Sequence, residues 1–108
     1  MENNELYGKR HKSLAKAIFK EDLENVLSNP KWILVDIRYP EDFDSGHLQN
    51  AINVLDGNTL EELITKNENK NILLNCYSGH TVSILSSDLV KKGFKNIYFL
   101  DEEISDCL

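Results

Sequence analysis

The chain has 108 residues, of which 41% are apolar and 28% charged, and its formal net charge at pH 7 is -6. These values predict one soluble domain that buries a single core without disulfide staples. The acidic balance argues against nucleic acid and anionic membranes as partners, because binding phosphates requires a dense basic stripe.

The two cysteines, Cys76 and Cys107, are too few for a disulfide framework. The sequence contains no C-x-x-C or H-x-x-x-H spacing, so it indicates no zinc site, and we expect neither a metal nor another cofactor. No apolar run approaches the roughly 20 residues that span a bilayer, and the N-terminus lacks the apolar middle of a secretory signal. We therefore expect a cytoplasmic protein with reduced thiols.

Apolar periodicity and turn residues predict strands that alternate with helices. Residues 1–14 are polar and are predicted to be a loosely ordered lead-in to a single domain over residues 15–108. The predicted elements that follow are, in chain order, a strand at 17–19, a helix at 21–27, a strand at 32–35, a helix at 40–46, a strand at 51–54, a helix at 60–64, a strand at 72–74, a helix from 81 or 82 to a cap at Gly93, and a strand at 97–100.

The runs at 32–35 and 72–74 are continuously apolar, which is typical of strands that are covered on both faces, as in parallel sheets. Strands alternating with helices at this spacing predict an α/β fold with right-handed crossovers and helices on both faces of the sheet. Sites in such folds lie beyond the carboxyl ends of the strands. Asp36, Arg38 and Cys76 all fall there.

Cys76 precedes a tight loop, Tyr77 to His80, that leads into a predicted helix. Gly79 allows the loop to curl, and its N–H groups with the helix terminus can form a nest for an anion. An ordinary cysteine is only about 3% thiolate at pH 7. Lowering its pKa by about two units requires about 2.7 kcal/mol, which these donors and a protonated His80 can supply. Alternatively, Cys76 is simply a small core residue.

Three segments resemble signatures of the rhodanese-like (sulfurtransferase) family. Residues 35–53, VDIRYPEDFDSGHLQNAIN, resemble the upstream signature, and residues 76–81, CYSGHT, resemble the six-residue active-site loop. Residues 93–100, GFKNIYFL, resemble the downstream motif. The three occur in the family's order and together span about residues 17 to 101.

The resemblance implies a three-layer domain with a central, mainly parallel sheet of about five strands flanked by helices. It also implies that the catalytic Cys76 takes sulfane sulfur from thiosulfate or a persulfide and passes it to a thiol or cyanide. Asp36 and His47 are expected to support the site, although Asp36 and Arg38 can simply pair with each other. The residues expected to bind the donor are Tyr77, Ser78, Gly79, His80, Thr81 and Arg38.

The chain departs from the family pattern at several positions. The active-site loop contains no lysine or arginine, which predicts a weak thiosulfate site or another donor, such as a protein persulfide. Asp101 to Glu103 replace the usual Gly-Gly, so acids near the loop are expected to disfavour anionic donors. Gln49-Asn50 replaces Pro-Gly and is expected to loosen a turn. The chain ends at Leu108 without the family's tryptophan-bearing helix, so residues 12–17 or a second subunit are expected to cover the sheet, in a monomer or a homodimer.

Other readings stay open at this point. The chain can be a non-catalytic rhodanese-like module that carries sulfur or binds another protein. A phosphatase or arsenate reductase is disfavoured, because cysteine-dependent phosphatases carry an arginine where this chain has Val82. Cys107 is either a loose tail cysteine or a partner that resolves a persulfide on Cys76. The basic cluster at 9–12 is either solvated or docks an acidic partner.

Overall fold

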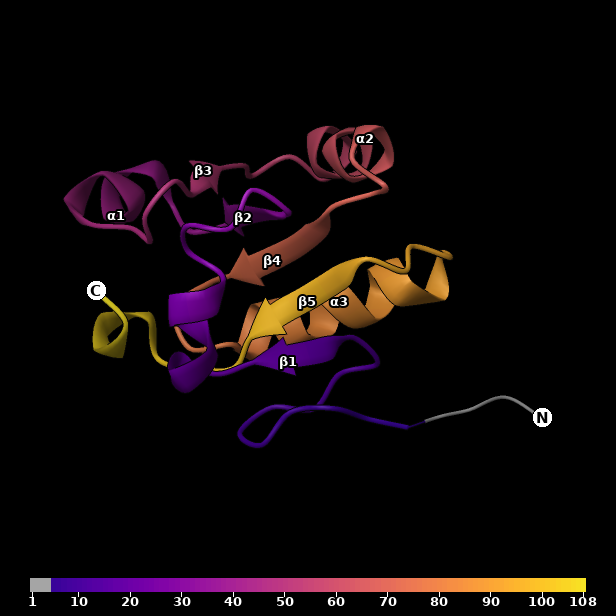
Figure 1. Ribbon diagram of the computed structural model, residues 1–108, viewed down its shortest axis with the longest axis horizontal. Helices are drawn as coiled ribbons and strands as arrows, with labels where there is room; N and C mark the ends of the chain where they lie inside the picture. Colours follow the sequence, from indigo (N-terminus) through magenta and orange to yellow (C-terminus); the bar gives the residue numbers. More distant parts are fainter. Residues whose placement is uncertain (1–4) are drawn as a thin grey trace.

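Five parallel strands form the sheet at the centre of the computed structural model, which describes residues 5–108 (Figure 1). The strands follow the order β1-β5-β4-β2-β3, and every neighbouring pair is parallel. The predicted parallel α/β sheet is therefore confirmed. Their bounds are β1 Lys16–Ile18, β2 Trp32–Asp36, β3 Ile52–Asn53, β4 Asn71–Asn75 and β5 Ile97–Leu100.

The helices lie close to the predicted positions, with two differences in type and length. The segment predicted as a helix at 21–27 is a 3₁₀ helix, η1, and α2 is longer than predicted because Asp56 caps it by accepting the N–H of Thr59 at 2.8 Å. A short 3₁₀ helix near the C-terminus, η2, has no counterpart in the prediction. The bounds are η1 Lys20–Asn25, α1 Pro40–Ser45, α2 Gly57–Lys66, α3 His80–Lys91 and η2 Ile104–Asp106.

Both faces of the sheet are covered, which explains the continuous apolar runs in β2 and β4. Val35 and Leu74 face a cluster that includes Ile64 of α2 and Leu89 of α3. Their sequence neighbours Leu34 and Leu73 face a second cluster formed with η1, the turn before β3 and η2. Successive strand residues point to opposite faces, so consecutive positions in the middle of a doubly covered strand are apolar.

Residues 5–14 are more ordered than the predicted lead-in. Tyr7 and Ser13 exchange two backbone hydrogen bonds of 2.8 and 2.9 Å, which close the segment into a loop. We call residues 7–13 the N-terminal loop. Residues 1–4 of the predicted lead-in lie outside the described residues.

Asp101 holds the N-terminal loop against the end of β5. Its fully buried carboxylate accepts the backbone N–H groups of Lys9, Arg10 and His11 at 2.7, 2.8 and 3.1 Å. The Arg10 side chain pairs with Glu103 at 2.9 Å. The backbone of the basic cluster is therefore bound to the end of β5, and Asp101, expected as an acid near the active-site loop, is fully buried and hydrogen-bonded.

The segment after the N-terminal loop packs on α3. The Ser13 hydroxyl contacts those of Ser86 and Ser87 at 2.9 and 3.0 Å, and the N–H of Leu14 donates to Ser87 Oγ at 2.8 Å. Ala15 is buried in the cluster on the same face. These contacts support the prediction that residues 12–17 cover part of the sheet.

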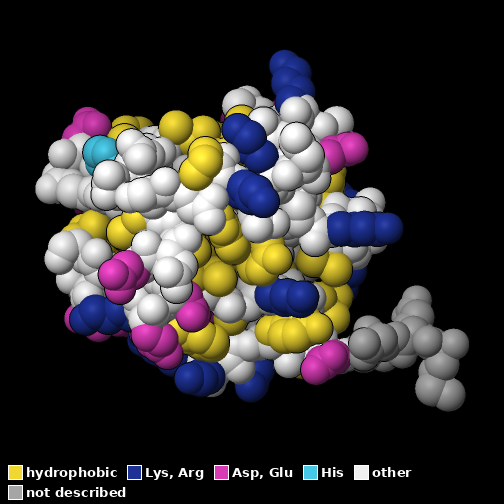
Figure 2. All heavy atoms as spheres, viewed as in Figure 1, with side chains coloured by type: hydrophobic (Ala, Val, Ile, Leu, Met, Phe, Trp, Pro, Cys, Tyr) yellow, Lys and Arg dark blue, Asp and Glu magenta, His cyan; other side chains and the backbone are white. Residues whose placement is uncertain are grey.

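Charged side chains of both signs are spread over the face shown in Figure 2, with apolar side chains visible between them. Within residues 5–108, no helix combines the length and the apolar character needed to cross a membrane.

Replacing Asp101 with asparagine tests whether this carboxylate holds the N-terminal loop. Burial alone would raise its pKa, but the donors from Lys9, Arg10 and His11 outweigh burial and keep the pKa below its ordinary value of 3.8. The stabilisation is therefore complete above that ordinary value and is lost as the pH falls through the folded pKa. We expect Asp101→Asn to lower the free energy of unfolding by about 2 to 4 kcal/mol at neutral pH.

Urea unfolding at several pH values measures this effect. The difference between Asp101→Asn and the native chain should shrink as the pH falls below about 4. Glu103→Gln is the control, since its exposed pair with Arg10 is worth at most about 1 kcal/mol. Equal losses in the two variants would contradict the role given to Asp101.

Candidate active site

Cys76, the predicted nucleophile, lies directly after β4, at the carboxyl edge of the sheet. The residue is only 4% exposed and belongs to the same buried cluster as Leu74 and Val82. It also lines a pocket of about 300 Å³ that opens between the ends of β2, β3 and β4. The other residues lining this pocket are Ile37, Tyr39, Leu55, Tyr77 and Thr81. The thiol is thus packed on one side and faces a pocket on the other.

Backbone N–H groups without an acceptor follow Cys76. Within residues 5–108, no acceptor takes the N–H groups of Tyr77, Ser78, Gly79 or Thr81, and none of them donates to the Cys76 sulfur. The loop leads into the first turn of α3, where backbone donors have no intrahelical partner. These groups can hold negative charge that develops beyond the sulfur atom.

Gly79 has both the conformation and the close contacts that require glycine. Its φ of 95° lies in the left-handed region. A Cβ atom there would lie 2.9 Å from the carbonyl oxygen of Leu100 and 3.2 Å from the Cα of Asp101. The loop is therefore pressed against the end of β5.

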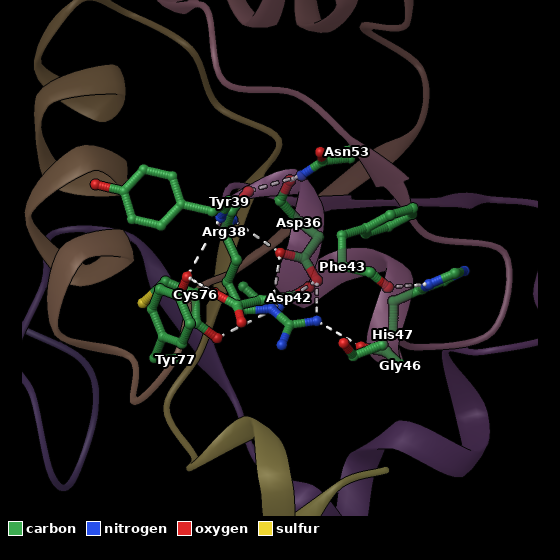
Figure 3. A network of polar contacts seen from close by, with 12 residues as sticks. Asp36, Arg38, Tyr39, Asp42, Phe43, Gly46, His47, Asn53, Cys76 and Tyr77 are labelled. Atoms are coloured by element: carbon green, nitrogen blue, oxygen red, sulfur yellow. Dashed lines mark hydrogen bonds and ion pairs between the residues drawn. The ribbon is translucent and has the colours of Figure 1, made fainter.

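The Arg38 guanidinium forms a buried fork with Asp36. Its Nε donates to both carboxylate oxygens at 3.1 and 3.0 Å, and Nη2 donates to Asp36 at 2.9 Å and to the Gly46 carbonyl at 2.6 Å. The Arg38 side chain is 6% exposed and lies over the Tyr77 ring (Figure 3). This geometry favours a bracing role, so the prediction that Arg38 binds the donor loses support.

Tyr77 ties the active-site loop to α1. Its hydroxyl donates to the Asp42 carboxylate and accepts the N–H of Tyr39 at 3.3 Å (Figure 3). The hydrogen bond to Asp42 raises the pKa of Tyr77 above its ordinary value, with desolvation adding to the effect. The side chain thus positions the loop, while its ring lines the pocket.

His47 lies on the far side of α1 from the pocket. Its Nδ1 is 2.8 Å from the Phe43 carbonyl, and its ring stacks on that of Phe43 at 3.8 Å between centroids (Figure 3). The geometry supports the predicted bracing role.

The remaining loop residues occupy different surroundings. Thr81 lines the pocket, whereas His80 is exposed and its ring meets the edge of the His11 ring at 5.5 Å. His11 Nδ1 lies 3.1 Å from Asp101, so the N-terminal loop reaches the active-site loop. Ser78 Oγ accepts the N–H of His80 at 3.5 Å, which is a long contact.

Several contacts at the site were not predicted from the sequence. Tyr39 and Leu55 line the pocket because they follow the ends of β2 and β3, and the strand-end rule could have found them. Asp42 and His11 carry no comparable local signal. Their partners are 35 and 90 residues away in the chain.

Cys107 is half-buried rather than loose. It packs against the cluster beneath η2, and burial raises the pKa of its thiol, with nearby Glu102 adding to the effect. Both cysteines are free thiols. In the described part of the chain, no three His, Cys, Asp or Glu side chains are grouped in a way that could hold a metal ion.

The profile of the Rhodanese-like domain family matches residues 19–107 of the chain. The chain is 31% identical over 87 residues to the tRNA uridine(34) hydroxylase of Photorhabdus laumondii. The aligned region covers 75% of this chain but only 25% of that protein. It is 27% identical to the thiosulfate sulfurtransferase GlpE of Pseudoalteromonas translucida, over 85% of this chain and 82% of that protein. Its fold matches the single-domain sulfurtransferase RDL2 of Saccharomyces cerevisiae with a TM-score of 0.62 at 17% identity, over 88% and 89% of the two chains.

Substituting Arg38 tests the buried fork. Arg38→Ala leaves the buried Asp36 carboxylate without its guanidinium partner and with only the backbone N–H of residue 38 from this pair, so we expect the free energy of unfolding to fall by about 3 to 5 kcal/mol. Arg38→Lys keeps the charge but loses the fork, so we expect a loss of about 1 to 3 kcal/mol. Arg10→Ala, which breaks an exposed pair, should cost at most about 1 kcal/mol. Thermal and urea unfolding measure all three, and a loss for Arg38→Ala no larger than for Arg10→Ala would refute the bracing role.

The contact between Tyr77 and Asp42 can be followed by titrating the phenol. The difference in ultraviolet absorbance between the native chain and Tyr77→Phe isolates this one tyrosine. We expect it to ionise above the ordinary phenol pKa of 10.0 in the native chain, and closer to that value in Asp42→Asn. Identical titrations in the two backgrounds would show that Asp42 does not hold the hydroxyl.

Proposed function

Because the chain belongs to the rhodanese-like domain family, we propose that it is a sulfurtransferase in which Cys76 carries sulfane sulfur as a persulfide. One observation supports this role most directly: Cys76 faces a pocket at the carboxyl edge of the sheet, beside loop N–H groups that have no acceptor in the described chain. Sulfur transfer is also the activity named for the thiosulfate sulfurtransferase relative, which matches most of this chain.

The first step charges the enzyme. The Cys76 thiolate attacks the outer sulfur of the donor, the new sulfur–sulfur bond forms, and the old bond breaks with its electron pair on the leaving group. With thiosulfate the leaving group is sulfite. The enzyme then holds a Cys76 persulfide anion, and the loop N–H groups are placed to share its charge.

The second step discharges it. A thiol or cyanide attacks the outer sulfur of the persulfide, and the Cys76 thiolate leaves with the electron pair of the broken bond. Cyanide becomes thiocyanate, whereas a thiolate becomes a new persulfide. Neither step requires a general base once the thiolate has formed.

The side chains around Cys76 serve this chemistry by position. The fork between Arg38 and Asp36 holds the end of β2 and supports the Tyr77 ring. Tyr77 anchors the loop to α1, and Gly79 allows its close approach to β5. Thr81 contributes a hydroxyl to the pocket wall.

A non-catalytic carrier is the second candidate. The 4% exposure of Cys76 favours it, because a recessed sulfur is shielded from acceptors that diffuse freely in solvent. A carrier would accept sulfur on Cys76 but release it only to a particular partner protein. A cytoplasmic location and a choice between monomer and homodimer remain predictions.

Loading of Cys76 is the direct test of the proposed function. After incubation with thiosulfate, mass spectrometry should find one added sulfur atom on Cys76 in the native chain and in Cys107→Ser, but none in Cys76→Ser. Adding cyanide should then release thiocyanate. Cys107→Ser is a matched control, because the chain has only these two cysteines.

The outcomes separate the candidates. Loading with turnover supports the enzyme, and loading without turnover supports the carrier. Loading that persists in Cys76→Ser, or no loading with any sulfane-sulfur donor, would rule out both.

A further inference from the structure

We infer that the Cys76 pocket selects a sulfur donor with an apolar organic group and one negative charge, such as an organic persulfide, over the thiosulfate dianion. This inference rests on the proposed function and adds the substrate class to it.

The pocket wall is apolar around the sulfur. Apart from Cys76 and Thr81, its lining consists of aromatic and aliphatic side chains, namely those of Ile37, Tyr39, Leu55 and Tyr77. Tyr39 and Leu55 are 66% and 55% exposed, so the pocket mouth presents large apolar side chains to solvent. In Figure 3 the Tyr39 ring extends away from the polar network, on the side where the Cys76 sulfur lies. An apolar group of a donor can cover these side chains, and removing such surface from water stabilises the complex.

Among residues 5–108, no lysine, arginine or histidine lines the pocket. Arg38 is the cation near Tyr77, but its fork is already occupied by Asp36 and Gly46. The Asp42 carboxylate accepts a hydrogen bond from the Tyr77 hydroxyl, which places a negative charge near the pocket. The chain as a whole carries a net charge of -6. A dianion that enters this pocket gives up hydration without meeting a side-chain cation.

The loop N–H groups follow Cys76 directly, so the charge that they can stabilise is the charge on the transferred sulfur. Within the described chain the free donors belong to the residues that directly follow Cys76. They can stabilise the terminal sulfur of a donor R–S–S⁻ while its R group lies against Tyr39 and Leu55. The three sulfonate-type oxygens of thiosulfate would instead face the apolar side of the mouth.

The transfer balances for such a donor. The Cys76 thiolate attacks the terminal sulfur of R–S–S⁻, a bond forms between the two sulfur atoms, and the bond to R–S breaks. The products are the Cys76 persulfide anion and the thiolate R–S⁻. An aromatic thiosulfonate, R–SO₂–S⁻, is a stable probe with the same single charge, and its leaving group is the sulfinate R–SO₂⁻.

The experiment compares two probes on the whole chain. Rates of Cys76 persulfide formation are measured by mass spectrometry with thiosulfate and with benzenethiosulfonate. We expect the second-order rate constant for benzenethiosulfonate to exceed that for thiosulfate by about tenfold or more, which corresponds to at least about 1.4 kcal/mol. Equal rates, or a preference for thiosulfate, would overturn the inference and leave the proposed function standing.

A charge swap at the pocket mouth locates the source of the preference. Leu55→Lys places a cation beside Cys76 and removes apolar surface, so we expect the ratio of the two rate constants to fall by about fivefold or more, with a higher rate for thiosulfate. Ile84→Lys is the matched control, because it changes the net charge by the same amount. Ile84 is 54% exposed on α3 and does not line the pocket. Circular dichroism establishes that both variants fold.

An unchanged ratio in Leu55→Lys, or an equal change in Ile84→Lys, would show that the pocket mouth does not set the preference and would refute the inference. Failure of both probes to load Cys76 in the native chain would refute the proposed function, and the inference with it.

Discussion

A buried carboxylate must gain enough hydrogen-bond donors to offset its lost hydration, and this constraint shapes both sides of the active-site loop. The strand β4, which ends next to Cys76, lies between β5 and β2 in the sheet. A fully buried aspartate follows or ends each of these two neighbours, Asp101 and Asp36. Asp36 recruits the Arg38 guanidinium, and Asp101 recruits the N-terminal loop. Cys76 thus lies between two buried carboxylates whose donors come from the segments that border the pocket.

Two different sets of groups surround Cys76: the backbone of the active-site loop and the side chains at the pocket mouth. In the proposed mechanism, charge on the transferred sulfur is met by main-chain groups, which depend on the path of the loop and on Gly79 rather than on neighbouring side chains. The pocket mouth is built from Tyr39, Leu55 and Tyr77, which come from three different strand ends. Tyr39 and Leu55 can change with little effect on the loop backbone, whereas Tyr77 also anchors the loop through Asp42. Substitutions at Tyr39 and Leu55 can therefore alter the pocket mouth while the loop keeps its path.

Much of the fold could be read from local patterns, because two-sided burial forces continuous apolar runs at β2 and β4. The rule that sites lie at strand ends also predicted that Cys76, Asp36 and Arg38 lie at the same edge of the sheet, and the buried fork fits the simple pairing of Asp36 and Arg38 better than donor binding. The role of Asp101 could not be predicted, since its donors lie about 90 residues away and are backbone groups that any sequence offers. The conformation of the turn at Gln49-Asn50 could not be predicted from the sequence either. Asn50 adopts a φ of 65° there, in the left-handed region that glycine usually occupies, in the turn before β3.

The way Asp101 is held has a consequence for engineering the chain. Main-chain N–H groups of Lys9, Arg10 and His11 do the binding, so most side chains are acceptable at Lys9 and Arg10, whereas proline, which lacks the donor, is not. A shortened version should keep Tyr7, whose backbone pairs with Ser13 and closes the loop. Trimming past that point would remove the hydrogen-bond donors of a buried carboxylate while leaving every residue from Cys76 to Thr81 in place.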